Sequence, residues 1–488
     1  MPRNGGNERP ARRRFLASAA AASASVGLGR VSGAEPGAAT DGKAYGATGD
    51  GKTDDTRALQ TALDAAAASG GGAVFLPAGT YSTRTLTVGT GVHLVGAGIE
   101  ATVLKLRADT NADLIRSRGF GALSGTNRPE GPYNWSIRDL TLDGNRARNS
   151  RGCGLRVYAF GYILRDLRIR QCADAGISSE WSTDDPVWTE DGLGTPGDSM
   201  EAQVVNLKVH HCGRGGIVFR GPHDSQFANC VVYDTKTNGI HVQSGKTFSA
   251  TGCQFVNCHV WGSHEYAWKV EAGFVTLDNC VGEWASSAQV HLNEGDATIA
   301  AGRFFGSNKF RHVGIEIGSP EVVVYGSQID ARMSDLVGGA FKFTNEGGSS
   351  KIKALIYQTQ GVPYTGTPAR GSLLELVVNG VDGGSATVFP RGTLSWNGGT
   401  PIVRHLSATA AWQPPEVPQG ATAGTTLTVA GAKPGDTVAV GFSQGIPVGV
   451  LLVGAVSAPD TVAITLWNQT GRSLRLAPGT LRADCWVH

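Results

Sequence analysis

The chain has 488 residues, a formal net charge of +2, and only 17% charged residues. This balance lacks the basic clusters that nucleic-acid binders carry, so we expect no nucleic-acid partner. Past the N-terminus, no apolar run reaches the roughly 18 residues that a membrane-spanning helix needs, so we also expect no membrane attachment of the mature protein.

The N-terminus resembles an export signal. The residues RRRFL at positions 12–16 precede the weakly apolar run ASAAAASASVGLG, which is too short to span a bilayer. The Arg-Arg-x-Phe-Leu pattern resembles the twin-arginine (Tat) signal, and SGA ending at Ala34 offers small residues for cleavage. We therefore expect residues 1–34 to be removed and the protein to be secreted by the twin-arginine route.

A capping segment follows, with the sequence AYGATGDGKTDDTRALQTALDAAAASGGGAVFLPAGTYSTRTLTV at positions 44–88. Its apolar residues recur at helical spacing and predict one amphipathic helix: Ala58, Leu59, Ala62, Leu63 and Ala66. Such a helix would cover the open end of a solenoid, whose core is otherwise exposed. Asp54 or Asp55 can accept hydrogen bonds from the first helical turn, so we interpret this acidic pair as structural rather than catalytic.

This opening resembles that of the pectate-lyase-like superfamily, which includes family 28 glycosidases, related lyases and epimerases, and phage tailspikes. The resemblance covers about residues 43–390 and implies a right-handed parallel β-helix that acts on polysaccharides. The sequence lacks the Tyr-Gly-Phe-Asp-Pro-His-Glu motif of alginate epimerases. The Asn-Thr-Asp, Asp-Asp, Gly-His-Gly and Arg-Ile-Lys set of family 28 polygalacturonases is not recognisable either.

The middle of the chain repeats itself in steps of 27, 40, 23, 23, 27, 22 and 24 residues. The aligned inward positions are Leu140, Leu167, Leu207, Cys230, Cys253, Cys280, Gly302 and Gly326. Alternating apolar and polar residues within each repeat predict short strands, and this period predicts a solenoid. Together with the resemblance, the pattern indicates an all-β fold: a right-handed parallel β-helix at 43–390 with an N-terminal capping helix.

The cysteines follow the same rhythm. Cys230, Cys253 and Cys280 share one position of the repeat, and Cys172, Cys212 and Cys258 share another, five residues later. Stacked coils place like residues about 4.8 Å apart, so we expect internal ladders of buried thiols. Disulfides between coils stay open as an alternative. Zinc is the least favoured reading, since no Cys-x-x-Cys pair is present.

The second strand of each repeat predicts which side chains point outward. The expected outward pairs, in coil order, are Arg156 and Tyr158, Ser178 and Glu180, Val218 and Arg220, His241 and Gln243, Lys269 and Glu271, His291 and Asn293, Glu316 and Gly318, and Lys342 and Thr344. Acids, bases and cations on consecutive coils are typical of a catalytic groove. We expect Glu180, Arg220, His241, Lys269 and Glu271 to be catalytic, with Arg156, Tyr158, Gln243, His291 and Asn293 binding substrate.

One coil carries an acidic insertion, SSEWSTDDPVWTEDGLGTPGDSMEAQ, which accounts for the step of 40 residues. We expect it to form one wall of the groove, with Trp181 or Trp188 stacking on sugar rings and Asp184 or Asp185 near Glu180. A solvated insertion or a calcium site are the alternatives, although no Asp-x-Asp-x-Asp-Gly loop is present. We expect no required cofactor, with Ca²⁺ as an option.

Two chemistries compete for the groove. In β-elimination, Arg220 would neutralise a uronate carboxylate while His241 or Lys269 removes the proton at C5. In hydrolysis, two carboxylates must lie about 5–9.5 Å apart, which only Glu180 and a loop aspartate could achieve. A lyase is slightly favoured over a hydrolase, and a tailspike-like protein that binds polysaccharide without cleaving it remains a third reading.

The end of the chain changes character. QPPEVPQG lies within a predicted linker at 391–420, and the segments TTLTVAG, DTVAVGF and DTVAITLW alternate as sandwich strands in a domain at 421–488. This tail resembles the small C-terminal β-domains of tailspike-like proteins, where they imply trimerisation or carbohydrate contact. A homotrimer is therefore a possible assembly.

Overall fold

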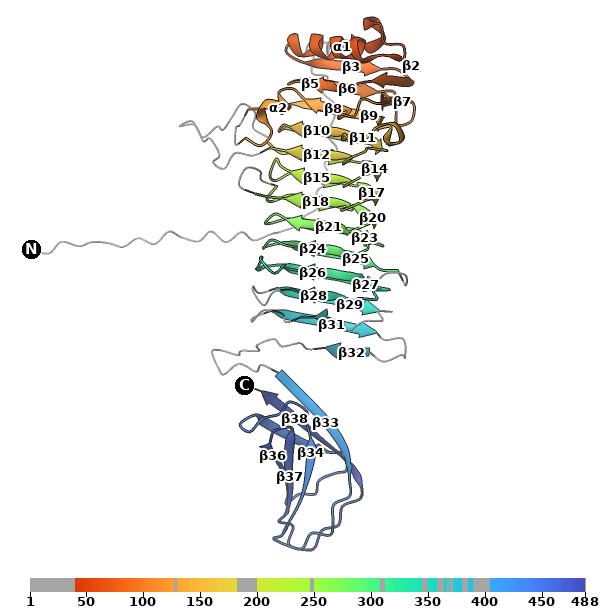
Figure 1. The fold of residues 1–488 in the computed structure, drawn as a ribbon. Helices are drawn as coiled ribbons and strands as arrows, with labels where there is room; N and C mark the ends of the chain where they lie inside the picture. Colours follow the sequence, from red (N-terminus) through yellow and green to blue (C-terminus); the bar gives the residue numbers. More distant parts are fainter. Residues whose placement is uncertain are drawn as a thin grey trace, which may run out of the picture. The chain divides into compact units, whose positions relative to one another are not determined.

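The chain forms a right-handed parallel β-helix of about 11 turns, followed by a small β-sandwich, in the computed structural model (Figure 1). The structure describes residues 40–487 except 127–129, 182–199, 246–249, 308–311, 345–349, 358–363, 367, 369–371, 380–384 and 389–403. The predicted export signal at 1–34 lies outside the described residues. Among the residues that are described, no helix is long and apolar enough to cross a membrane.

Each regular coil contributes two strands to a larger sheet, sheet A, and one to a smaller sheet, sheet B. The described strands of sheet A are β1 (Thr40–Asp41), β2 (Asp50–Asp54), β3 (Gly72–Leu76), β4 (Gly79–Thr83), β6 (Val92–Gly96), β7 (Thr102–Leu106), β9 (Trp135–Asp143), β11 (Tyr162–Arg170), β13 (Gln203–Val205), β14 (Lys208–Cys212), β16 (Gln226–Ala228), β17 (Val231–Thr235), β19 (Gln254–Val256), β20 (His259–Ser263), β22 (Thr276–Asp278), β23 (Val281–Glu283), β25 (Thr298–Phe305), β27 (Gln328–Ser334), β29 (Lys351–Tyr357), β31 (Leu373–Asn379) and β32 (Ser385–Val388). Sheet A is parallel except for the last pair, β31 and β32.

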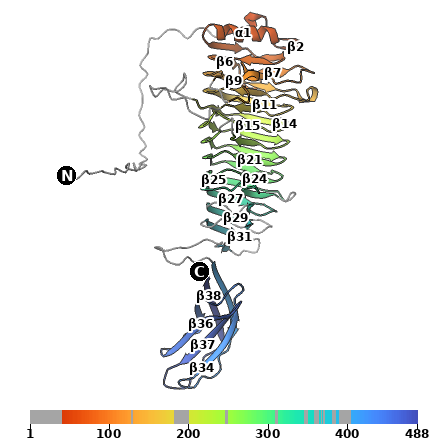
Figure 2. The same ribbon diagram turned by 60° about the vertical axis from the view of Figure 1, so that its left-hand side comes forward.

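Sheet B presents the face on which the outward residues were expected. Its described strands are β5 (Leu86–Val88), β8 (Ile115–Ser117), β10 (Leu155–Tyr158), β12 (Ile177–Glu180), β15 (Ile217–Arg220), β18 (Ile240–Gln243), β21 (Tyr266–Glu271), β24 (Ala288–Leu292), β26 (Val313–Ile317), β28 (Phe341–Phe343) and β30 (Tyr364–Thr365). Every described pairing in this sheet is parallel and joins one coil to the next, as Figures 1 and 2 show.

The corner between the two sheet-A strands of a coil is held by asparagines. Asn206, Asn229, Asn257 and Asn279 all have positive φ angles of 49–57°, a left-handed conformation that Asn tolerates better than most residues. The side-chain amides of Asn229, Asn257 and Asn279 each donate to the Asn of the preceding coil, at distances of 2.8–3.2 Å. Asn206, the first of the series, donates to Asp166 Oδ1 at 2.9 Å. The ladder therefore fixes the bend and the coil register together.

The helix α1 (Thr56–Ala68) covers the first coils, as the sequence predicts (Figure 2). The helix buries one face, made of Leu59, Ala62, Leu63 and Ala66. The short 3₁₀ helix η1 (Gly42–Tyr45) lies beside it. The roles of the two aspartates differ from the expected simple cap. Asp54 accepts a hydrogen bond from Thr56 N at 3.1 Å, whereas buried Asp55 accepts from Thr48 N at 2.7 Å, Thr48 Oγ1 at 3.1 Å and Gly49 N at 3.2 Å.

The cap yields a first testable prediction. Asp55→Ala should lower the free energy of unfolding by about 1–3 kcal/mol, because it leaves buried donors without an acceptor. The matched change Asp54→Ala, at a half-exposed carboxylate with ion pairs to Arg107 and Arg84, should cost about 1 kcal/mol or less. Denaturant titration of both variants measures the difference, and equal losses would contradict the assigned role of Asp55.

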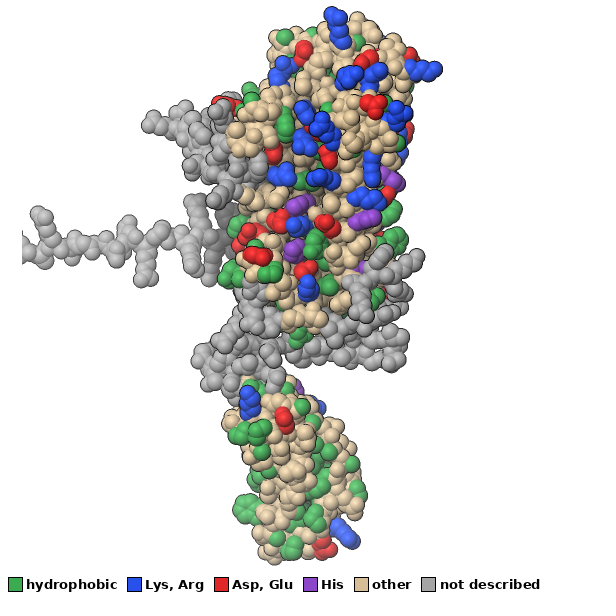
Figure 3. All heavy atoms as spheres, in the orientation of Figure 1, with side chains coloured by type: hydrophobic (Ala, Val, Ile, Leu, Met, Phe, Trp, Pro, Cys, Tyr) green, Lys and Arg blue, Asp and Glu red, His purple; other side chains and the backbone are tan. Residues whose placement is uncertain are grey.

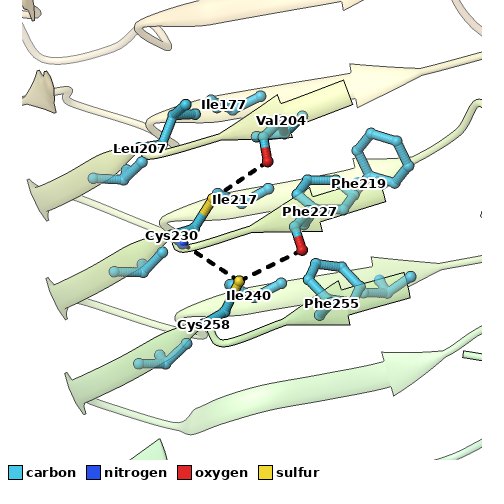
Figure 4. Close-up of a cluster of buried hydrophobic side chains, with 14 of the residues drawn as sticks. Ile177, Val204, Leu207, Ile217, Phe219, Phe227, Cys230, Ile240, Phe255 and Cys258 are labelled. Carbon is cyan, nitrogen blue, oxygen red and sulfur yellow. Dashed lines mark hydrogen bonds between the residues drawn. The ribbon is translucent and has the colours of Figure 1, made fainter. Parts of the chain in front are cut away.

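The core of the β-helix is built from the inward rows of the coils and contains six free, buried thiols: Cys172, Cys212, Cys230, Cys253, Cys258 and Cys280. Figure 4 shows Cys230 and Cys258 stacked on consecutive coils, with Cys230 N donating to Cys258 Sγ at 3.4 Å. Burial raises the pKa of Cys253 to about 12, so its thiol is unreactive at neutral pH. Thiol ladders are therefore confirmed, and disulfides are not formed between the described cysteines.

The predicted ladder membership was partly wrong. Cys258, not Cys253, stacks with Cys230 and Cys280, because β17 pairs with β20 and β20 with β23. Cys253 precedes β19 and belongs to a different position of the coil. The error arose because the connection between β18 and β19 is five residues longer than the corresponding connection between β15 and β16. These extra residues precede Cys253, whereas the predicted alignment required them to follow it.

The C-terminal unit is a sandwich of two antiparallel sheets. One holds β33 (Arg404–Trp412), β35 (Thr437–Phe442) and β38 (Gly479–Val487), and the other holds β34 (Thr422–Thr428), β36 (Val450–Ala458) and β37 (Thr461–Asn468). Leu427, Ile464 and Leu481 pack together between the sheets. The strand β33 falls inside the segment expected to be a linker, and its pairing with β38 makes it part of this unit.

Candidate active site

Sheet B brings the expected outward residues into two straight rows. In the first row, neighbouring coils pair in register through the residues Arg156, Ser178, Val218, His241, Lys269, His291, Glu316 and Lys342. The second row pairs Tyr158 with Glu180, Glu180 with Arg220, and Gln243 with Glu271. The alignment of coils made from the sequence is therefore confirmed for this face.

His241, Glu271 and Lys269 form a hydrogen-bonded cluster at the centre of the rows. His241 Nε2 lies 2.5 Å from Glu271 Oε2, and Lys269 Nζ lies 2.8 Å from Glu271 Oε1. Burial alone would raise the pKa of Glu271, but the bonds from His241 and Lys269 outweigh it and hold this pKa at about 2. The carboxylate is therefore ionised and can only accept, so His241 donates through Nε2–H. In the neutral form of His241 the lone pair would then be on Nδ1.

The low pKa of Glu271 predicts an acid-dependent loss of stability. Because this pKa lies at about 2 in the folded protein against an ordinary 4.5, the ionised carboxylate stabilises the fold above pH 4.5 and this contribution disappears as the pH falls towards 2. We expect the melting temperature of the wild type to fall more steeply over this range than that of Glu271→Gln. Parallel curves for the two proteins would contradict the pairing.

A second ionic pair, between Arg220 and Glu180, lies on the second row, in the two coils that precede His241. Arg220 Nη1 is 3.9 Å from Glu180 Oε2, and Arg220 Nε donates to Gln243 Oε1 at 2.9 Å. Glu180 is 6% exposed, and its Oε1 atom has no hydrogen-bond partner among the described residues. Arg220 is thus held from two sides while its side chain remains one-third exposed.

A groove of about 510 Å³ lies over the first row, a size typical of small-ligand sites. Its floor is made by the small residues Ser178 and Val218, between the larger Arg156 and His241 of the same row. The full lining is Arg151, Cys153, Arg156, Asp174, Ala175, Ser178, Arg214, Gly215, Val218, Arg220, Thr237, Asn238, His241 and Glu265. Four arginines against two carboxylates give the groove a positive character, which suits an acidic ligand.

The space-filling view shows this distribution on the face of the molecule. Lys and Arg side chains gather over the upper coils in Figure 3, around the level of β8 to β12, whereas His, acidic and basic side chains mix below them. Basic side chains are therefore concentrated on the upper coils of this face, where some acidic side chains also lie.

Three predicted sugar-binding residues are not available to a ligand. Tyr158 and Trp181 are buried with Phe160 in a separate apolar cluster, against Phe120 of the short helix α2 (Phe120–Leu123). Tyr158 OH donates to the carbonyl of Thr126 at 3.0 Å, so its polar end is bonded inside the protein. The expected stacking of Trp181 on a sugar ring is therefore wrong.

His291 is also buried, at 7% exposure, and its ring packs on that of Tyr266 with centroids 4.7 Å apart. Its Nε2 atom lies 3.2 Å from the carbonyl oxygen of Gly318. It supports the sheet rather than lining the groove. Neighbouring Asn293 likewise has a buried Oδ1 atom, without a hydrogen-bond partner in the described part of the chain. Asp184, Asp185 and Trp188 lie outside the described residues.

Some groove residues lie in the turns before the strands of sheet B, and the strand pattern of the sequence did not predict them. Four groove residues lie one to four residues before the start of a strand of sheet B: Arg151, Asp174, Arg214 and Glu265. Asp174 links two of these turns, because it accepts from Gly152 N at 2.8 Å and lies 3.4 Å from Arg214 Nε. The available signal was the polar residue that precedes each Ala-Gly or Gly-Gly pair, as in CADAG and CGRGG.

The described ranges contain no group of three or more His, Cys, Asp or Glu placed to hold a metal ion. The calcium site considered for the acidic insertion falls on residues 182–199, outside the described chain. The groove chemistry that can be described therefore rests on arginine, histidine, lysine and carboxylate side chains.

Comparison with known proteins places the β-helix among polysaccharide-related folds. Residues 42–264 match the family model described as rhamnogalacturonase A/epimerase, pectate lyase-like. Mannuronan C5-epimerase AlgE4 of Azotobacter vinelandii is 34% identical over 216 residues, covering 41% of this chain and 35% of that protein. Alginate lyase 7 of the same organism is 34% identical over 213 residues, covering 41% and 23%. Each match spans about a third or less of the relative's own length.

Solved structures agree on the fold. The A-module of the A. vinelandii epimerase AlgE4 superposes with a TM-score of 0.57 at 22% identity, over 73% of this chain and 100% of that one. The tailspike protein of E. coli bacteriophage HK620, solved with a pentasaccharide, superposes with a TM-score of 0.53 at 11% identity, over 92% and 93%. These likenesses show a shared β-helix.

Proposed function

We propose that this chain modifies a uronate-containing polysaccharide by removing the proton at C5. The support is a parallel β-helix whose residues 42–264 match the pectate lyase-like family model, and a cation-lined groove beside a histidine–glutamate pair. The favoured outcome is β-elimination. The observation that carries the proposal is the bond from His241 Nε2 to the ionised Glu271, which leaves Nδ1 as the basic nitrogen of a side chain that lines the groove.

The first requirement of the reaction is to make the C5 proton acidic. A uronate carrying its negative charge resists further electron density, so a cation must neutralise the carboxylate as the proton leaves. Arg220 is fixed by Glu180 and Gln243 and lines the groove, so it is suited to this role without having to reorganise. Arg220 and His241 occupy neighbouring strands, β15 and β18.

The proton is then transferred to a base. His241 Nδ1 takes the C5 proton, the electron pair of the C5–H bond forms the C4–C5 double bond, and the C4–O bond breaks with its electrons on the leaving oxygen. That oxygen takes a proton from water. Lys269 is less suited to be the base, because its ammonium group is bound to Glu271 at 2.8 Å and it does not line the groove.

Epimerisation at C5 is the second candidate. It begins with the same proton transfer and ends when the carbanion takes a proton from water on the opposite face, so the same groups serve the first step of both reactions. The names of the curated relatives, mannuronan C5-epimerases and an alginate lyase, support this shared first step. Hydrolysis by Glu180 and Glu271 is disfavoured, since three strand steps of about 4.8 Å separate them, well beyond the roughly 9.5 Å limit of a carboxylate pair.

A panel of acidic and neutral polysaccharides separates the functional classes. On a uronate polymer, ultraviolet absorbance from a new double bond supports β-elimination, and a change in C5 configuration seen by NMR supports epimerisation. New reducing ends without a double bond would contradict proton abstraction in favour of hydrolysis. Binding of a polysaccharide without any of these changes would indicate a tailspike-like protein that binds its ligand and does not modify it. Secretion by the twin-arginine route, calcium binding and a homotrimer remain predictions from the sequence.

A further inference from the structure

Two arginines on neighbouring coils lie side by side although their charges repel. Arg116 on β8 and Arg156 on β10 are register partners in sheet B. Like charges directly opposite each other in a sheet reduce its stability. Both guanidinium groups also flank the ring of Phe120, with Cζ atoms 5.9 and 6.0 Å from its centroid. The sheet therefore holds two cations together at a cost that a purely structural role does not explain.

A single buried carboxylate holds both arginines. Asp113 is 2% exposed, and its oxygens lie 2.6 Å from Arg116 Nε and 3.2 Å from Arg156 Nε. Asp113 also accepts from Cys153 N at 2.8 Å, which fixes the carboxylate itself. Both arginines bind Asp113 through Nε, the inner nitrogen, and Arg156 Nη2 also donates to Cys153 Sγ at 3.2 Å. Their side chains remain 42% and 34% exposed. One negative charge against two positive charges leaves a net positive site.

The pair lines a hollow of about 280 Å³ that continues the central groove. Arg151, Arg156 and Asp174 line both spaces. Arg151 is itself held by a hydrogen bond from Nε to the carbonyl of Asn111, at 2.7 Å. Asp174 is engaged with Arg214 and Gly152. The hollow thus presents three positioned guanidinium groups next to the groove.

We propose that Arg116 and Arg156 form an anion subsite for the carboxylate of a second acidic sugar of the polymer, beyond the one that reacts. Arg156 lies three strand steps from His241, about 14 Å along the solenoid, which is farther than one sugar ring reaches. Guanidinium groups bind carboxylates through paired N–H donors, and the negative charge of the ligand would offset the repulsion within the pair. The identity of the polymer rests on the proposed function.

The test uses the full chain with Arg116→Gln and Arg156→Gln, and Arg84→Gln as the matched control. Arg84 is an exposed arginine near the cap, 3.9 Å from Asp54 and outside both hollows. Calorimetry measures binding of an oligouronate series from a disaccharide to a hexasaccharide, with dextran as the uncharged polymer. We expect each subsite substitution to weaken hexasaccharide binding about tenfold, or about 1.4 kcal/mol, with little effect on the disaccharide. Each substitution removes charged hydrogen-bond donors that only the longer ligand reaches.

Thermal stability distinguishes a binding role from a structural one. Arg116→Gln removes a repulsion but also one ion pair of Asp113, which keeps Arg156 Nε and Cys153 N as partners. Because the two effects oppose each other, we expect only a small change in melting temperature together with weaker binding. Unchanged hexasaccharide binding, equal losses for the disaccharide and hexasaccharide, or equal binding of dextran would overturn the subsite. Arginine-dependent binding without turnover would support the subsite and contradict the proposed reaction. Turnover of the polymer, with a hexasaccharide affinity and a rate that neither substitution changes, would support the reaction and contradict the subsite.

Discussion

His241→Ala is expected to reduce turnover of a uronate polymer by about 10²–10⁴-fold, the range that a positioned acid–base group contributes. The loss should appear in kcat rather than KM, because His241 is assigned to proton transfer and the arginines to binding. We expect an effect of this size because His241 is held in one orientation by the bond from Nε2 to the ionised Glu271, and its side chain lines the groove. Initial rates on the polymer identified by the panel measure it.

Another histidine–glutamate pair provides the control. His259 Nε2 lies 3.5 Å from Glu283 Oε1 on sheet A, away from the groove, so His259→Ala should leave kcat within about twofold of the wild type. Glu271→Gln tests the positioning role: it should lower kcat with little change in KM, because Glu271 acts through His241. Equal rates for wild type and His241→Ala would remove His241 from the mechanism.

Arg220→Met is expected to lower kcat/KM by about 10²–10³-fold, comparable to the loss of one preorganised charge-stabilising donor. The same substitution should lower the free energy of unfolding by about 1–3 kcal/mol, because it leaves the buried Glu180 carboxylate without its nearby cation. Activity and stability are therefore both affected, and a second substitution is needed to separate them.

The double variant Arg220→Met with Glu180→Gln makes that separation. Removing the negative charge of Glu180 as well should restore most of the stability, since no isolated buried charge remains. It should not restore activity, because the cation that neutralises the substrate is still missing. Recovery of activity along with stability would show that Arg220 serves the fold alone. Denaturant titration and kcat/KM on the wild type, Arg220→Met, Glu180→Gln and the double variant complete the cycle.

Much of the fold could be predicted because a solenoid repeats one local pattern. Alternation within each repeat indicates strands, and the spacing between repeats indicates coils, so the rows containing His241, Lys269 and Glu271 followed from the alignment. The cap was equally readable, since the apolar stripe of α1 has one face to bury. Both features depend on residues close in sequence or on an exact repeat.

The errors arose where residues outside the repeat decide the outcome. Tyr158 and Trp181 were expected to face a ligand, but α2 and Phe160 cover them, and no coil alignment contains that long-range contact. Cys253 was placed in the wrong row because the position of a five-residue loop within one coil cannot be read from the repeat length. Arg151 and Arg214 of the groove were missed because turns, unlike strands, carry no alternation that assigns a direction.

The position of the groove also explains why these residues act together. Strands of sheet B bring chemically different side chains to one line, at the spacing of the coils, and the small Ser178 and Val218 leave room above the sheet. The turns before the strands add Arg151 and Arg214 from the side. Binding groups and the proposed base thus come from different parts of the coil and meet over the same row.

The central claim is that the protein removes a proton from C5 of a uronate through His241. The most direct test offers a uronate polymer labelled with deuterium at C5 and follows the label by NMR. The account predicts that the wild type releases the deuterium to water, more slowly than it releases protium, and that His241→Ala does not release it. Cleavage or other modification of the polymer with the C5 deuterium fully retained would contradict the account.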